Sequence, residues 1–182
     1  MMKVFIGGSR KISKLSSDVQ RKLDEVLADR LSIVIGDAPG ADKSVQEYLH
    51  SKGYRDVEVF CSGSRCRNNV GNWPTRQVAV NSSRRDFDFY AAKDLRMSEE
   101  ASFGLMIWDG RSAGTLMNVL RLIKQNKRAV IFEAPKDRFV ELNTESEWKN
   151  FFSACTDEVR TRIEKLSASD SKVTTPVQPS LL

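Results

Sequence analysis

The chain has 182 residues, of which 40% are hydrophobic and 29% are charged, and its net charge at pH 7 is +5. This length and composition are typical of one ordinary globular domain with a buried core. No apolar run approaches the roughly 20 residues of a membrane span, which excludes an integral membrane protein. The first residues, MMKVFIGGSRK, lack the apolar region of a signal peptide, so we expect a cytoplasmic location.

The first third of the chain alternates short apolar runs with amphipathic segments. Three runs are predicted to be buried strands, at residues 3–7, 32–35 and 57–60. Two helices are predicted between them, over residues 17–30 and 41–52. Val19, Leu23 and Val26 share one face of the first helix, and Ser16 or Ser17 can cap it.

The same alternation returns after an irregular segment. Residues 61–82 have no periodicity, which indicates a functional or a disordered loop. A helix is then predicted over 85–97, a buried strand over 103–108, a helix from about 113 and a strand over 129–132. Strands and helices at this spacing predict an α/β, Rossmann-like three-layer fold with a mainly parallel central sheet in residues 1–135.

A C-terminal extension is expected over residues 136–166. It begins with a possible edge strand at 139–142, and Thr144 and Glu147 have the spacing of a capping box. The helix they start carries an apolar stripe that must pack on the core sheet or on a second subunit: Trp148, Phe151, Phe152, Cys155 and Val159. Residues 167–182 have the composition of a disordered tail.

The three cysteines are Cys61, Cys66 and Cys155. An odd number argues against a disulfide framework, so reduced thiols are expected. Cys61 and Cys66 have zinc-finger spacing, but no second Cys/His pair accompanies them and the lone His50 lies in another segment. No metal site and no cofactor are therefore predicted.

Loops that follow the predicted parallel strands should meet at one edge of the sheet. Gly8, Ser9 and Arg10 follow the first strand. The glycine lets the backbone approach a ligand closely, the serine offers a hydroxyl, and the arginine is a bidentate donor for phosphate or carboxylate. The alternative is a tight turn with a solvated arginine.

The loop after the second strand reads GDAPGAD, and its candidate site residues are Gly36, Asp37, Ala38 and Gly40. Its carboxylates can accept hydrogen bonds from ribose hydroxyls or from a base. In the alternative interpretation, Asp37 stabilises a turn, and Asp42 lies at the positive end of the next helix.

The loop after the 103–108 strand opens a helix. Its candidate phosphate-binding residues are Asp109, Gly110, Ser112, Gly114 and Thr115. Free N–H groups at a helix start, the helix dipole and two hydroxyls favour an anion. No lysine follows the second glycine, so the loop is not a Walker A motif. The alternative is a helix start capped by Ser112 or Thr115.

Together, GGSR, GDAPGAD, KDxxM (Lys93, Asp94 and Met97) and WDGxSxGTxxN resemble motifs of the SLOG superfamily, which includes the DprA proteins and the Lonely-guy (LOG) phosphoribohydrolases. The resemblance covers roughly residues 3–133. It implies a Rossmannoid fold that binds a nucleotide-derived small molecule, with phosphate at the loop 109–115, and it implies a homodimer.

One residue, Asn118, departs from the LOG motif at the position of the glutamate that supports catalysis. GTLMN at 114–118 aligns with the GTxxE end of the LOG motif, whose glutamate supports cleavage of an N-glycosidic bond. An amide at Asn118 cannot act as a carboxylate base or nucleophile. If the chain is an enzyme, the candidate catalytic residues are Asp109, Asp94 and Asp37, since an oxocarbenium-like transition state needs a nearby carboxylate.

Three functions are therefore weighed. The first is binding or sensing of a nucleotide-derived ligand, because the phosphate loop is retained and the glutamate is absent. The alternative is an N-glycoside hydrolase or transferase that acts on nucleoside 5′-monophosphates. DNA binding in the manner of DprA is favoured least, because residues 65–85 are basic but contain a single aromatic residue, Trp73.

Overall fold

The computed structural model describes residues 2–79 and 87–173. The first half of this part contains β1 (Lys3–Gly8), α1 (Ser17–Ala28), β2 (Ser32–Gly36), α2 (Ala41–Ser51), β3 (Val57–Ser62) and β4 (Thr75–Val78). The second half contains α3 (Phe87–Glu100), β5 (Phe103–Trp108), α4 (Ala113–Lys124), β6 (Arg128–Glu133), a 3-10 turn (Ala134–Lys136), β7 (Arg138–Leu142), α5 (Glu145–Ser153) and α6 (Asp157–Val173).

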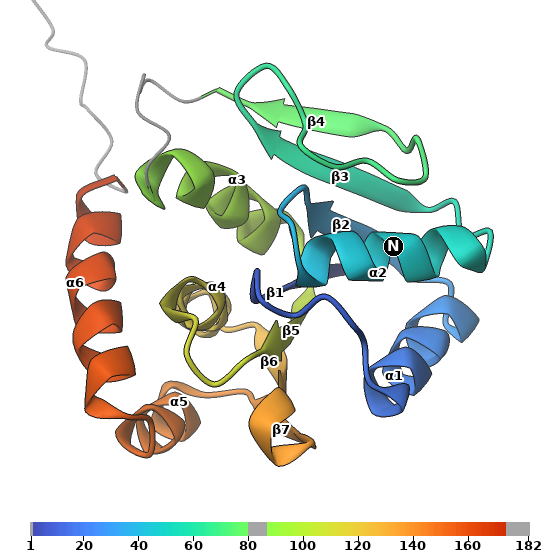
Figure 1. Cartoon of the computed structure of the whole chain (residues 1–182). Helices are drawn as coiled ribbons and strands as arrows, with labels where there is room; N and C mark the ends of the chain where they lie inside the picture. Colours follow the sequence, from blue (N-terminus) through green and yellow to red (C-terminus); the bar gives the residue numbers. More distant parts are fainter. Residues whose placement is uncertain (1, 80–86, 174–182) are drawn as a thin grey trace, which may run out of the picture.

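The strands form one seven-stranded sheet within the described residues, in the order β4-β3-β2-β1-β5-β6-β7. Neighbouring strands are parallel except β6 and β7, which are antiparallel. Helices α1 and α2 cover one face, and α3 and α4 cover the other, with α5 and α6 outside α4 (Figure 1). This confirms the predicted α/β, Rossmann-like three-layer fold.

The alternation of side chains along β1 explains the two cores. Successive residues of a strand point to opposite faces of the sheet. Val4 and Ile6 therefore pack in the cluster that contains the apolar faces of α1 and α2. Phe5 packs in the other cluster, with residues of α3, α4, α5 and α6. Both faces of the central strands are buried, as parallel sheets require.

The strand order places a topological switch point between β1 and β5. From β1 the chain proceeds through β2 and β3 on one side, and it returns to add β5 on the other side of β1. The loops that follow β1 and β5 consequently diverge at the carboxyl edge of the sheet. Open parallel sheets bind ligands in the crevice that forms at such a point.

Two elements differ from the sequence predictions. The segment 61–82, expected to have no regular structure, contains β4, whose residues pair with β3 from Thr75↔Val59 onwards. The single helix expected after Thr144 is two helices, because α5 ends at Ser153 and α6 starts at Asp157. Residues 167–173, assigned to a disordered tail, belong to α6; residues 174–182 and 80–86 lie outside the described part of the chain.

The apolar stripe of the extension packs on the molecule's own core. Trp148 and Val159 are buried members of the α3–α4 side cluster, and Phe151, Phe152 and Cys155 pack against it. Thr144 and Glu147 form the predicted capping box at the start of α5. Within residues 2–79 and 87–173, no helix has both the length and the apolar character needed to cross a membrane.

The expectation of reduced thiols at Cys61 and Cys66 is wrong in this structure, where the two residues form a disulfide. Cys61 lies near the end of β3, and the chain turns back through Gly63, which has a φ of +76°. The turn brings the Cα atoms of the two cysteines to 5.1 Å, within the range that a disulfide spans. A disulfide within one short loop needs no framework of several bridges, which is why counting cysteines missed it.

Candidate functional site

A pocket of about 710 Å³ lies at the switch point, and we call it the central pocket. It is bounded by the loops after β1, β2 and β5, by α3 and the start of α4, and by α6. The residues that line it are Phe5, Gly7, Gly8, Arg10, Lys11, Ala38, Asp42, Arg67, Tyr90, Ala91, Lys93, Asp94, Met97, Asp109, Arg111, Ser112, Ala113, Gly114, Thr115, Asn118, Arg162, Lys165 and Leu166.

Ser9 joins the three loops beneath the pocket. Its hydroxyl lies 3.2 Å from Thr115 Oγ1 and accepts a hydrogen bond of 3.1 Å from the N–H of Asp109. Its carbonyl accepts from the N–H of Ala41, the first residue of α2, at 3.1 Å. Ser9 is 1% exposed and does not line the pocket, so it positions the loops and leaves ligand contact to its neighbours.

The start of α4 offers unused backbone donors. Ser112 is the N-cap, and its Oγ accepts from Thr115 N at 3.3 Å and from Thr115 Oγ1 at 3.0 Å. The N–H groups of Ala113 and Gly114 have no hydrogen-bond acceptor among the described residues, as expected for the first turn of a helix. Both residues line the central pocket, so an anion there can accept from them.

Asp109 has a structural role within the same loop. Its Oδ1 accepts from the N–H of Arg111 at 2.9 Å and from the N–H of Ser112 at 2.8 Å. These bonds hold the loop in the conformation that starts α4. Asp109 still lines the pocket, but one of its carboxylate oxygens is already satisfied by backbone donors.

Three ionisable groups meet at the floor of the pocket. Lys93 is 3% exposed, and its Nζ donates to Asp94 Oδ1 at 2.6 Å. Burial acts to lower the pKa of Lys93, but the charges of Asp94 and Asp42 outweigh it, and the pKa lies above its ordinary value. Burial raises the pKa of Asp42 to about 6, although the nearby Lys93 opposes this. Asp42 also accepts from Ala38 N at 3.2 Å, which agrees with a role at the start of α2.

Asn118 is a connector between two charged groups. Its Nδ2 donates to Asp94 Oδ2 at 3.3 Å, and its Oδ1 accepts from Arg121 Nη1 at 2.7 Å. Arg121 is buried and makes two further bonds, each of 2.8 Å, to the carboxylate of Asp170 on α6. An amide fits this position because it presents a donor to Asp94, where a carboxylate would be repelled.

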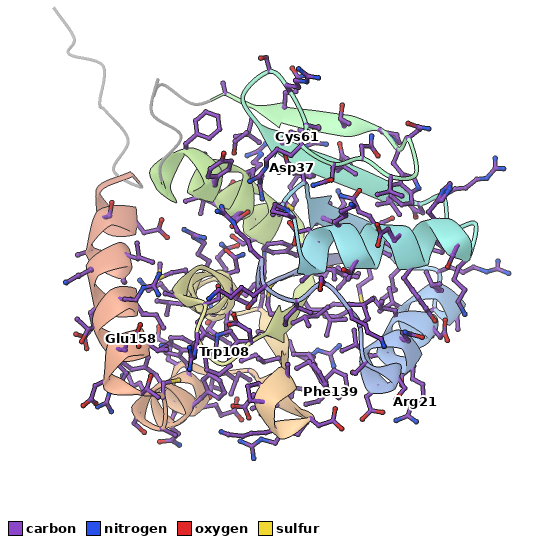
Figure 2. The ribbon with its side chains drawn as sticks, in the orientation of Figure 1. Arg21, Asp37, Cys61, Trp108, Phe139 and Glu158 are labelled. Atoms are coloured by element: carbon purple, nitrogen blue, oxygen red, sulfur yellow. A yellow bond between two sulfur atoms is a disulfide. The ribbon has the colours of Figure 1, made fainter. Side chains whose placement is uncertain are left out.

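The loop 63–74 contributes Arg67, which sequence reasoning did not single out. Arg67 Nη2 lies 2.6 Å from Asp37 Oδ1, and its backbone N–H donates to Oδ2 at 2.9 Å. Burial alone would raise the pKa of Asp37, but these bonds from Arg67 outweigh it and lower the pKa. Arg67 follows Cys66, the disulfide partner of Cys61. Asp37 and Cys61 are labelled in Figure 2.

Tyr90 of α3 forms an aromatic surface in the pocket. The guanidinium carbon of Arg67 lies 4.2 Å from the centroid of the Tyr90 ring, and that of Arg10 lies 5.1 Å from it. The sequence predicted a helix here, but the position of Tyr90 in a pocket depends on the loops that cover it. Arg67 gave no signal because its segment has no periodicity.

The pocket is electropositive. Seven of its lining residues are basic and three are acidic. Arg67 and Lys93 have acidic partners, whereas five cations pair with no carboxylate in the described part of the chain: Arg10, Lys11, Arg111, Arg162 and Lys165. Unpaired positive charge around free N–H groups is suited to an anionic ligand.

Most of the predicted site residues do meet around this pocket. Those that line it are Gly8, Arg10, Ala38, Lys93, Asp94, Met97, Asp109, Ser112, Gly114, Thr115 and Asn118. Those that do not line it are Ser9, Gly36, Asp37, Gly40 and Gly110. Gly110 instead borders a smaller pocket of about 260 Å³ beside Pro135. Arg162 and Lys165 were missed because charged residues on a helix look like an ordinary solvated face.

The comparisons with known proteins identify no relative of this chain. No protein-family model matches the chain, and no curated protein or solved structure is significantly similar to it. Among the residues that the structure describes, no group of three or more His, Cys, Asp or Glu side chains could hold a metal ion. The proposal of a function therefore rests on the geometry of the central pocket.

Proposed function

We propose that the central pocket binds a nucleotide or a nucleotide-derived molecule, with a phosphate at the start of α4. The observation that carries the proposal is the combination of free N–H groups at Ala113 and Gly114 with unpaired cations in one pocket at the switch point. The cation of Arg111 completes this phosphate cradle, and the hydroxyl of Thr115 holds the loop in place through its hydrogen bond to Ser112. Helix starts of this kind are recurrent anion sites because the donors and the helix dipole act together.

The rest of the pocket suits a nucleoside. Tyr90 and the guanidinium groups of Arg67 and Arg10 that lie over its ring form a set of planar groups against which a base can stack. Asp94 and Asn118 line the pocket, and their oxygens can accept hydrogen bonds from ribose hydroxyls. Membership of the SLOG superfamily and a homodimeric state stay predictions from the sequence.

A binding or sensing role is favoured over catalysis because two of the three candidate carboxylates, Asp37 and Asp109, have structural roles. Asp37 is 1% exposed, pairs with Arg67 and does not line the pocket. Asp109 accepts two backbone hydrogen bonds that shape its own loop. Neither residue is a free carboxylate placed over a ligand.

Thr115→Val is expected to weaken binding of nucleoside monophosphates by roughly tenfold or more, because it removes the hydroxyl that bonds Ser112 and Ser9 and so disturbs the start of α4 that holds the phosphate. Isothermal titration with the adenine, guanine, cytosine and uracil monophosphates, NAD and cyclic mononucleotides measures this. Thr75→Val makes the same chemical change at an exposed position on β4 and should leave binding intact. If no nucleotide binds to the wild type, or if the two variants behave alike, the proposal fails.

A second candidate is the N-glycoside hydrolase, and one observation favours it. Asp94 lines the pocket, and Lys93 and Asn118 orient its two oxygens, so a carboxylate lies next to the position where the LOG glutamate is expected. Such a group can stabilise an oxocarbenium-like transition state.

If the protein hydrolyses nucleoside 5′-monophosphates, Asp94→Asn should lower kcat by at least about 100-fold with little change in binding. Release of free base, followed by chromatography, measures kcat, and Asp109→Asn is the comparison because Asp109 has a structural role. Absence of base release from the wild type rules out the hydrolase and leaves the binding proposal standing.

A further inference from the structure

Helix α6 forms one wall of the central pocket although it lies outside the Rossmann-like core. Arg162, Lys165 and Leu166 of α6 line the pocket together with the loops of the sheet. In Figure 1, α6 stands along the outer side of α4. A ligand in this pocket therefore contacts a helix that the core fold alone does not supply.

The position of α6 is fixed by both apolar and charged contacts. Val159 and Ile163 are each 2% exposed and belong to the core cluster beneath the helix. One turn beyond the pocket, Asp170 accepts two hydrogen bonds of 2.8 Å from Arg121 of α4. Arg121 in turn holds Asn118, which lines the pocket, so α6 is tied directly to the site.

The two cations on this wall have no acidic partner in the described part of the chain. Neither Arg162 nor Lys165 forms an ion pair with any described residue, while Arg160 on the same helix pairs with Asp157. Both residues are exposed and line the pocket, so their charges are available to a ligand there. The phosphate cradle at α4 has its own donors in Ala113, Gly114 and Arg111, so these α6 cations are additional to it.

We propose that Arg162 and Lys165 form a second anion subsite, and that the ligand carries a second phosphate beyond the one held at α4. This inference rests on the proposed function and narrows its ligand class from nucleotides and nucleotide-derived molecules in general to doubly phosphorylated nucleotides. The volume of about 710 Å³ lies in the upper part of the range of roughly 300–1,000 Å³ that small-molecule sites have, which leaves room for such a molecule.

The test compares nucleotides that differ by one phosphate. Titrations use the nucleoside 5′-monophosphate of each base, its 5′-diphosphate and its 3′,5′-bisphosphate, all without divalent cations. In the wild type, at least one doubly phosphorylated form should bind roughly tenfold more tightly than the monophosphate. The variant Arg162→Ala/Lys165→Ala should lose this preference, because its affinity for the doubly phosphorylated form falls by roughly tenfold more than its affinity for the monophosphate.

A matched control separates the subsite from net charge. Arg55→Ala/Lys149→Ala also removes two positive charges, from exposed residues outside the pocket, and should keep the preference. If the wild type shows no preference for a second phosphate, or if the α6 variant retains it, the subsite is overturned while nucleotide binding stands.

Failure of the proposed function gives a different pattern, in which no nucleotide binds at all. Tripolyphosphate then serves as the probe, because it contains no nucleoside. Binding that is lost in Arg162→Ala/Lys165→Ala and kept in the control supports the anion subsite on α6. Absence of tripolyphosphate binding, or binding equal in both variants, overturns it.

Discussion

Gly40→Ala is expected to lower the free energy of unfolding by about 3 kcal/mol or more. Gly40 has a φ of +82°, a conformation that L side chains rarely adopt. A Cβ at this residue would lie 2.6 Å from the Cα of Arg10 and still closer to its carbonyl carbon and oxygen. These atoms belong to the backbone, so no side-chain rotation can relieve the contact.

Chemical denaturation of the wild type and of two glycine variants measures this effect. Gly53 also has a positive φ, +65°, but a Cβ there would meet nothing within 4 Å. Gly53→Ala should therefore cost only about 1 kcal/mol, from backbone conformation alone. Equal losses in the two variants would show that the loops after β1 and β2 are not in close contact.

The close contact at Gly40 also bears on the pocket. Arg10 lines the pocket, and its backbone is the surface against which Gly40 packs. The N–H of Ala41 donates to the carbonyl of Ser9 at 3.1 Å, which fixes the same two loops from the other side. The glycine of GDAPGAD therefore determines where the GGSR loop lies, and it acts on the site without lining it.

The fold and the location of the site could be predicted from the sequence because both follow from backbone patterns. Apolar runs alternating with amphipathic segments indicate parallel strands with helical connections. Parallel strands bring the loops at their carboxyl ends to one edge, whatever side chains those loops carry. Asp109, Ser112, Gly114 and Thr115 thus line the same pocket as Arg10, at the edge where the sequence predicted that their loops meet.

The side-chain partners could not be predicted because they are distant in the sequence. Ser9 turns inward to Thr115, 106 residues away, and Asp37 turns toward Arg67, 30 residues away. Both were expected to face a ligand, and neither lines the pocket. A polar residue in a glycine-rich loop has the same sequence signature whether it binds a ligand or another loop.

Asn118 is a second case in which the sequence does not reveal the partners of a polar side chain. The sequence revealed that a carboxylate was absent at this position, but it could not show what the amide does instead. In the structure the amide bridges Asp94 to Arg121, and Asp170 of α6 binds the other side of the Arg121 guanidinium. The function of this residue depends on a helix more than 30 positions further along the chain.

Asp170→Ala is expected to reduce the free energy of unfolding by about 3 kcal/mol, because it leaves the guanidinium of Arg121 buried without its carboxylate. The Arg121 side chain is 4% exposed, and the two bonds of 2.8 Å that it donates to Asp170 are lost. Denaturation with urea, followed by circular dichroism, gives the change in stability.

Asp157→Ala is the matched comparison on the same helix. Asp157 pairs with Arg160, but its side chain is 91% exposed, so its removal should cost about 1 kcal/mol or less. Asp170→Ala should also weaken the preference for a second phosphate, since α6 then no longer holds Arg162 and Lys165 in place, whereas Asp157→Ala should preserve it. Similar losses of stability in the two variants would mean that the Arg121–Asp170 pair does not anchor α6, and the wall of the pocket would need another explanation.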